Sequence, residues 1–271
     1  MGGVTDTASR RRWVWPVVLT TWAVALVVAA YLSARTAPPT VREQRTVAQA
    51  QRVVDQAVAE VLLASGGAAA GAVPEILAYD LRTGCRLTSA RDGQELNRVV
   101  MFTTPAGAEV STLDRLADGL PAAYQARVRQ GALRADAGEF VGLRGGVIGP
   151  GQVQVTVATG CRPPADLATA PGDVPGEADR AVDSALAALG VSEAQRRTHV
   201  APCPGGGAAR TVVADSAPLA AGQPPKAALE GLGAEREIVD RPELYGYRVG
   251  GTGVVIRIRE GLLTISATTG C

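Results

Sequence analysis

The sequence has few of the residues on which most catalytic and metal chemistry depends. It contains one histidine, His199, and one lysine, Lys226, among 271 residues. A single histidine excludes metal sites built from several histidines and leaves one residue for histidine-based catalysis. Basic and acidic residues balance at 27 against 26, which gives a net charge of +1. Because nucleic-acid-binding proteins usually carry a basic excess, this balance argues against that class.

Aromatic residues are scarce and unevenly placed. They make up 4% of the chain, and the three tryptophans all lie at or before Trp22. Stacking platforms for nucleic-acid bases and aromatic cages for cations depend on such rings. Tyr245 and Tyr247 fall on one face of a predicted strand, since alternate residues of a strand share a face. We interpret this pair as packing within a sheet, with a small recognition patch as the alternative.

Catalytic and phosphate-binding motifs are also missing. No Gly-x-Ser-x-Gly turn accompanies His199, and Gly205–Gly207 matches neither common phosphate-binding loop, so we predict a hairpin loop there. Paired carboxylates are the remaining option for hydrolysis. The candidates lie in sequence typical of solvated helix rims and loops: Asp114, Asp118, Asp136, Glu139, Glu235, Glu237, Asp240 and Glu243. We predict no catalytic residue, no cofactor and no metal site.

The N-terminus predicts a membrane anchor. Residues 1–12 include Arg10, Arg11 and Arg12, and an uncharged, largely apolar run follows over residues 13–34. About 20 apolar residues in a helix cross a hydrocarbon layer of roughly 30 Å, and flanking arginines favour the cytoplasmic side. We therefore predict that residues 13–34 contact membrane lipid in a single pass, with a short cytoplasmic tail. A cleaved signal peptide and a twin-arginine export signal are the alternatives.

A helix is predicted beyond the anchor. Thr40 and Glu43 form a capping-box pattern, and small or apolar residues recur at three- and four-residue steps from Val47 to Val61. Gly66 and Gly67 then end the pattern. This stripe predicts an amphipathic helix over residues 41–65 that covers a sheet. A membrane-proximal coiled coil is the alternative interpretation.

The chain contains an internal repeat with an offset of 110 residues. Residues 151–161 align without gaps on residues 261–271, and both segments end in Thr-Gly-Cys. Apolar residues alternate with polar or small ones in each segment, which is the period of a strand with one buried face. A turn and a further strand-like run precede each segment, so each half is predicted to end in a hairpin. We interpret the match as a duplication, with chance similarity of two hairpins as the alternative.

The predicted fold class is α+β, with a transmembrane helix followed by two related domains. Each domain reads as helix, two strands, helix and two strands, which favours an antiparallel sheet with helices on one face. The domains span residues 35–161 and 177–271. Between them, the proline-rich residues 162–176 predict a semi-rigid linker. In detail, we expect helices over residues 112–118, 121–130, 177–189 and 225–232, and strands over residues 76–87, 95–104, 140–148, 198–203, 210–214 and from 238 onward.

The four cysteines are predicted to be structural. Duplication favours one bridge in each half, Cys85 with Cys161 and Cys203 with Cys271. Disulfides persist in oxidising compartments outside the cytoplasm. A redox enzyme would prefer a Cys-x-x-Cys pair or an activated thiol, and this sequence has no Cys-x-x-Cys pair. A zinc site would use clustered ligands, which this sequence does not contain either.

These observations predict a membrane-anchored, extracytoplasmic binding or scaffold protein of a bacterial cell envelope, without catalytic activity. Its partner would be a protein or a cell-wall component, with no nucleic acid and an undetermined oligomeric state. The preference for arginine over lysine, with abundant alanine, glycine and valine, is typical of G+C-rich genomes such as those of actinobacteria. The alternatives are a cell-envelope hydrolase using a carboxylate pair and an extracytoplasmic sensor domain of a membrane complex.

Overall fold

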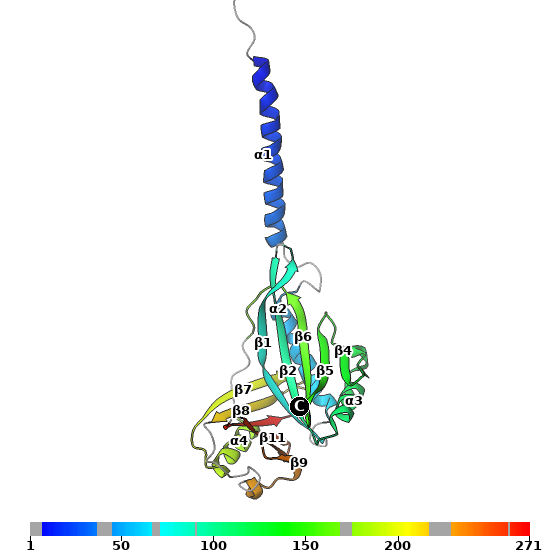
Figure 1. The fold of residues 1–271 in the computed structure, drawn as a ribbon, viewed down its shortest axis with the longest axis vertical. Coiled ribbons are helices and arrows are strands. Elements are labelled where there is room, and N and C mark those ends of the chain that lie inside the picture. Colours follow the sequence, from blue (N-terminus) through cyan, green and yellow to red (C-terminus); the bar gives the residue numbers. More distant parts are fainter. Residues whose placement is uncertain are drawn as a thin grey trace, which may run out of the picture.

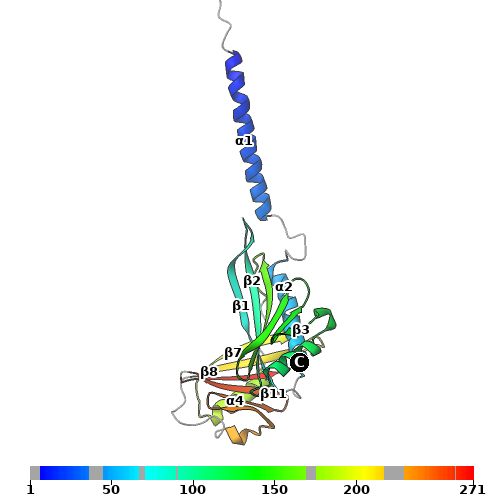
Figure 2. The ribbon, with the colours of Figure 1, turned by 45° about the vertical axis from the view of Figure 1, so that its right-hand side comes forward.

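The computed structural model describes residues 7–36, 45–66, 71–89, 91–168, 175–216, 229–259 and 261–271. Helix α1 stands apart from the rest of the chain, which forms two sheets with their covering helices (Figure 1). The strands of the first sheet run along the direction of α1, and those of the second sheet run across it (Figures 1 and 2). The chain is therefore an α+β protein with an N-terminal apolar helix.

Helix α1 spans Thr7–Thr36 and contains an apolar stretch from Trp15 to Ser33. At 1.5 Å per residue, these 19 residues extend about 28 Å, which is close to the thickness of a hydrocarbon layer. The described side chains of this stretch are exposed, including Trp15 and Trp22. None of the described residues outside the helix covers this apolar surface. The helix has the length and composition of a membrane anchor.

Helix α2 begins later than the sequence predicts. It spans Val47–Ala64, and Thr46 caps it: its hydroxyl accepts from the Gln49 N–H at 3.3 Å, while the Gln49 side chain accepts from the Thr46 N–H at 3.0 Å. The predicted box at Thr40 and Glu43 lies outside the described residues. The apolar stripe is fully buried against β2 and β6. The stripe therefore packs inside its own chain, and the coiled-coil alternative is wrong.

The first sheet has six antiparallel strands in the order β1-β2-β6-β5-β4-β3. Helices α2 and α3 pack on one face of it, where alternate residues of β6 such as Val153, Val155 and Val157 are fully buried. The elements after α2 are β1 (Val73–Thr88), β2 (Arg91–Thr103), α3 (Glu109–Gly119), η3 (Ala122–Tyr124), β3 (Arg127–Arg129), β4 (Ala132–Asp136), β5 (Gly142–Gly149) and β6 (Gln152–Arg162).

The second sheet also has six antiparallel strands, in the matching order β7-β8-β12-β11-β10-β9. Helix α4 covers one face, and Leu263, Ile265 and Ala267 of β12 are buried as the alternation predicts. Strands β6 and β12, which carry the sequence repeat, occupy the same place in the two orders. The elements are α4 (Glu177–Ala188), β7 (Ala194–Pro202), β8 (Ala208–Ser216), η4 (Glu230–Leu232), β9 (Arg236–Arg241), β10 (Leu244–Val249), β11 (Thr252–Arg259) and β12 (Leu262–Thr269).

The prediction of four strands in each half is wrong, because each sheet has two more. The predicted helix over residues 121–130 is a short 3-10 turn followed by β3, and β4 was not predicted. These short strands contain arginine, alanine and leucine, which favour helices locally. The pairing of β3 with β4 and of β4 with β5 decides their conformation. Of the predicted helix over residues 225–232, residues 225–228 lie outside the described part, and η4 is the helical portion that is described.

The first part of the predicted linker is packed and not extended. Arg162 ends β6 with its side chain buried, and the Pro163 carbonyl accepts from the Val47 N–H at 3.0 Å. The Gln51 side chain and the Ala168 backbone exchange two hydrogen bonds, of 3.1 and 2.8 Å. Residues 162–168, the first part of the predicted semi-rigid linker, are therefore held against α2.

The start of β1 joins the two halves. Val73 packs in one apolar cluster with Ile238, Val239, Leu244 and Val255 of the second sheet. A Cβ atom on Gly253 would lie 2.6 Å from Cγ1 of Val73, so only glycine permits this close approach. The face of the second sheet opposite α4 is thus covered, at this position, by a strand of the first sheet.

Candidate binding site

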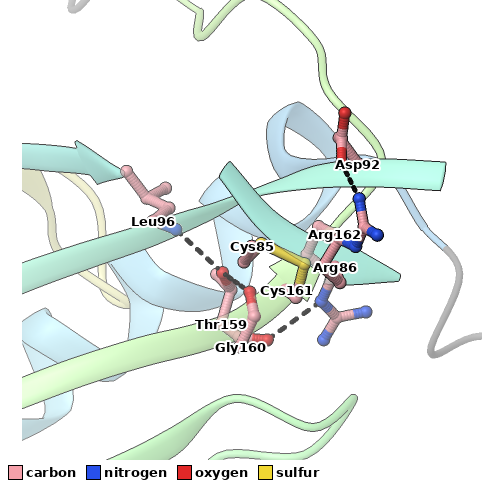
Figure 3. The surroundings of a disulfide bond; sticks show 8 residues. All are labelled: Cys85, Arg86, Asp92, Leu96, Thr159, Gly160, Cys161 and Arg162. Carbon is pink, nitrogen blue, oxygen red and sulfur yellow. Dashed lines mark hydrogen bonds and ion pairs between the residues drawn. A yellow bond between two sulfur atoms is a disulfide. The ribbon is translucent and has the colours of Figure 1, made fainter. Parts of the chain in front are cut away.

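The cysteines form the two bridges that the repeat predicts. Cys85 bonds to Cys161, with Cα atoms 5.8 Å apart, and Cys203 bonds to Cys271, with Cα atoms 5.5 Å apart. The first bridge joins β1 to β6 across β2 (Figure 3). A Cβ atom on Gly93, the β2 residue between them, would lie 2.5 Å from the Sγ atom of Cys161. The crossing of the bridge over β2 therefore requires glycine at this position.

A buried carboxylate forms the centre of the junction between the halves. Glu75 of β1 has a side chain only 3% exposed, and it forms an ion pair with Arg257 of β11. The distance between Nη1 of Arg257 and Oε1 of Glu75 is 2.7 Å, and Ser266 of β12 also donates to this carboxylate. Such a bidentate arrangement fixes both distance and orientation. It locks β1 onto the second sheet.

A second polar cluster joins α2, the first sheet and β7. Arg98, whose side chain is 2% exposed, donates to Asp55 at 2.6 Å and to the Val200 carbonyl at 2.6 Å. Its guanidinium also lies over the Tyr79 ring, 4.2 Å from the centroid. Tyr79 donates to Asp55, and burial is the main reason that the pKa of Tyr79 is raised to about 12. Burial likewise raises the pKa of Asp55, although Tyr79 and Arg98 act in the opposite direction.

His199 lies on β7 beside this cluster, as the sequence predicts a strand there. Burial lowers its pKa from the ordinary value of 6.5, and the positive charges of Arg98 and Arg197 lower it further. Below about pH 6.5, His199 is therefore protonated in the unfolded chain but stays neutral in the folded chain until the pH reaches its lower folded pKa. His199 thus makes folding less favourable as the pH falls from its ordinary pKa toward its lower folded value.

We therefore expect His199→Gln to reduce the acid sensitivity of the fold. On going from pH 7.5 to 5.5, the unfolding temperature of the natural full-length protein should fall further than that of the variant. Differential scanning fluorimetry in detergent at both pH values measures this difference. An equal fall in both proteins would contradict the assignment of a lowered pKa to His199.

A ligand-sized hollow lies on the face of the first sheet opposite α2 and α3. We call it the trough and define it by Asp80, Asn97, Phe140, Arg144, Gln154 and Thr156, with a volume of about 510 Å³. Pockets for small ligands typically enclose about 300–1,000 Å³. The trough is therefore large enough for a small ligand or for a segment of a larger one.

Strand register places the trough residues side by side. Asp80 pairs with Asn97, Asn97 with Ala158, and Ala158 with Gly142, which forms one row across β1, β2, β6 and β5. In the next row, Thr156 lies between Val99 and Arg144. Three strand spacings of about 4.8 Å give the row a width of about 14 Å. The amide and hydroxyl side chains of Asn97, Gln154 and Thr156 come from the middle strands β2 and β6 and form the floor, whereas the charged and aromatic residues Asp80, Arg144 and Phe140 come from the flanking β1, from β5 and from the turn before β5 and form the rims.

Two smaller cavities are lined by groups that hold the halves together. One, of about 310 Å³, lies between Pro150 of the first half and Arg241 and Arg257 of the second. Arg241 donates to the Pro150 carbonyl at 2.9 Å, and Arg257 pairs with Glu75. The other, of about 430 Å³, includes Arg248, which donates to the Ala72 carbonyl at 2.7 Å. Because their main polar groups already serve the junction, the trough is the better candidate for ligand binding.

The candidate carboxylates do not form one site with a common cavity. Asp114 and Asp118 lie on α3, and Glu139 pairs with Arg45 at 2.5 Å. Four others lie on or next to β9, namely Glu235, Glu237, Asp240 and Glu243. Among the described residues, no group of three or more His, Cys, Asp or Glu side chains is arranged to hold a metal ion.

The remaining predicted features have structural places. Tyr245 and Tyr247 are buried in the core of the second half, with ring centroids 5.6 Å apart, so the recognition-patch alternative is wrong. Gly205–Gly207 lie in the connection between β7 and β8, where the Cys203 N–H donates to the Gly207 carbonyl at 3.1 Å. This closes the predicted hairpin loop.

Sequence reasoning missed the trough. Its residues come from four strands and from the turn before β5, and these are adjacent only after β2 pairs with β6, a contact between segments about 60 residues apart. The single local signal is Phe140, an isolated aromatic residue next to Gly138 and Glu139 in a segment with no other ring. Comparison of the chain with protein families, with curated proteins and with solved structures finds no match.

Proposed function

We propose that this chain is a membrane-anchored, extracytoplasmic binding or scaffold protein of a bacterial cell envelope. In this proposal, residues 13–34 lie in the lipid, residues 1–12 are cytoplasmic, and the two sheets are outside. The trough is the binding surface, and no catalytic step takes place there. The observation that carries the proposal is the trough itself, a polar hollow of ligand size. It lies on the face of the first sheet that α2 and α3 do not cover.

Two features support the location. The apolar helix α1 has the length of a membrane span, and its charged neighbours Arg10, Arg11 and Arg12 favour a cytoplasmic N-terminus. Both disulfides belong in an oxidising compartment. The end of hairpin β1–β2 points toward α1, so the bridged end of the first sheet would be nearest to the membrane (Figures 1 and 2).

The arrangement of the halves supports a scaffold that presents one rigid surface. We infer that residues 35–161 and 177–271 arose by duplication, since their sheets share one strand order. The ion pair between Glu75 and Arg257 and the bond from Arg98 to the Val200 carbonyl join the halves. Binding costs less conformational entropy when the protein surface is already rigid. The joined halves therefore favour binding.

Photo-crosslinking in intact cells tests this function. A photoreactive amino acid at position 144, on the rim of the trough, should form a reproducible product with an envelope component. The same amino acid at position 110, an exposed site on α3 on the other side of the sheet, should not.

Protease added outside wall-stripped cells should remove the sheets and leave α1.

The outcomes separate the alternatives. Products of the same kind from both positions, or from neither, would contradict the trough as a binding surface. Release of soluble fragments from envelope material by the purified protein would contradict a non-catalytic function and favour the hydrolase. Full protection from external protease would contradict the topology.

A further inference from the structure

We propose that the trough binds an N-acetylated oligosaccharide, as found in a cell-wall glycan strand. This inference rests on the proposed function and names the ligand of the same site. It depends on three properties of the trough: an outward-held aromatic ring, a floor of amide and hydroxyl groups, and rims whose charges balance.

The turn before β5 holds Phe140 in an unfavourable place. Phe140 is 64% exposed, whereas the other phenylalanine, Phe102, is fully buried. Glu139 and Phe140 have φ angles of 53° and 62°, in the left-handed region that side chains disfavour. Residues other than glycine adopt this conformation only at an energetic cost. Neither burial nor local backbone preference therefore explains why the ring points outward.

The surrounding contacts maintain this turn. Arg45 pairs with the Glu139 carboxylate at 2.5 Å, and the buried Arg162 donates to the Glu139 carbonyl. The Ala137 N–H donates to the Val141 carbonyl at 2.8 Å, which closes the turn around Phe140. Several independent contacts thus hold a strained and exposed aromatic residue at the edge of a hollow. Strain of this kind is typical of functional sites.

An exposed ring at the edge of a polar trough suits a sugar. A pyranose ring has an apolar C–H face and a polar edge, so it can stack on an aromatic ring while its hydroxyl groups bond to a polar surface. An amphipathic ligand of this kind recovers the apolar burial that Phe140 lacks in the free protein. A purely polar ion would leave the ring exposed, and a purely apolar ligand would leave the floor without hydrogen bonds.

The floor provides the second half of this match. Asn97 and Gln154 carry amides and Thr156 carries a hydroxyl, so the floor offers donors and acceptors together. Gln154 donates to Thr156 at 3.1 Å, which orients its amide along the sheet. Paired donors and acceptors complement hydroxyl and acetamido groups, which also present both. With a row about 14 Å wide, the floor has room for more than one sugar ring.

The rims argue against a highly charged ligand. Arg82 and Glu95 line the same hollow beside the defining residues. Arg82 and Arg144 are matched by Asp80 and Glu95, so these four residues give the trough no net charge. Arg82 already pairs with Asp80 at 2.8 Å. Polyanions such as nucleic acids and teichoic-type phosphate polymers need a basic excess. A neutral acetamido sugar chain needs none, which makes it the ligand class that the charges favour.

Ligand-observed NMR with chitotetraose, a soluble chain of four N-acetylglucosamine units, tests this inference. The full-length protein in a detergent without sugar headgroups should transfer saturation to the acetyl protons of the probe. Phe140→Ala should weaken binding about tenfold or more, because an anchoring aromatic contact is lost. Phe140→Tyr should retain binding. Leu262→Ala, which removes another exposed apolar side chain far from the trough in sequence, is the matched control and should not change it.

The fold of each variant is checked by its unfolding temperature, so that loss of binding is not confused with loss of structure. Absence of binding to the natural protein, or equal binding by Phe140→Ala, would overturn the glycan assignment. The crosslinked product from position 144 separates this failure from failure of the proposed function. A product degraded by a muramidase supports the glycan. A product degraded only by protease overturns the glycan and leaves a protein-binding scaffold, and absence of any product overturns both.

Discussion

Replacing Glu75 with glutamine is expected to lower the free energy of unfolding by about 3–5 kcal/mol. The carboxylate of Glu75 is 3% exposed and is the ion-pair partner of Arg257, which is itself mostly buried. The variant would leave the Arg257 charge in the junction without its counter-charge. Removing one member of a buried pair costs more than the pair contributes, because the remaining charge keeps its desolvation penalty.

Urea unfolding of the full-length protein in detergent measures this loss. Glu177→Gln is the matched control, because Glu177 forms an exposed ion pair with Arg180 at 3.9 Å. Exposed pairs of this kind contribute little, so the control should unfold close to the natural protein. A Glu75→Gln variant as stable as the control would mean that the two halves do not depend on this contact. A large loss confined to one half would show that the two halves unfold independently, which would contradict a shared junction.

Removing either disulfide is expected to cost about 4 kcal/mol in the chain-entropy model. Cys85 and Cys161 are separated by 76 residues, and Cys203 and Cys271 by 68. Because the constrained loops are similar in length, the two double variants, Cys85→Ser with Cys161→Ser and Cys203→Ser with Cys271→Ser, should lose similar amounts. Each should still unfold in one transition, since β1 packs on the second sheet and the halves share a junction.

Circular dichroism during urea unfolding follows both halves at once. Two separated transitions in either double variant would contradict a shared junction and would favour independently folded domains. Loss in one variant only would show that the constrained loops are not equivalent. Addition of a reductant to the natural protein should reproduce the combined loss, and the quadruple variant should not respond to the reductant.

Local patterns in the sequence predicted the parts of the fold that depend on short-range chemistry. The apolar run of α1, the period-two alternation at Val153–Val157 and at Leu263–Ala267, and the bridges at Cys161 and Cys271 all follow from spacing and repetition. Alternation predicts a strand because successive side chains point to opposite faces, wherever the strand lies in the fold. The repeat predicts the cysteine pairing because each half carries two cysteines, so that one bridge in each half is favoured.

Tertiary structure decided the rest. Strands β3 and β4 have local sequences that favour a helix. They become strands only because β3 pairs with β4 and β4 pairs with β5. The partnership of β2 with β6 and the contact of Val73 with the second sheet join segments far apart in the chain. The trough exists only because those pairings align Asn97, Thr156 and Arg144 on one face. The sequence by itself determined the apolar N-terminal helix, the repeated hairpins and the bridges, whereas long-range strand pairing, which no local pattern encodes, created the surface that we propose binds the ligand.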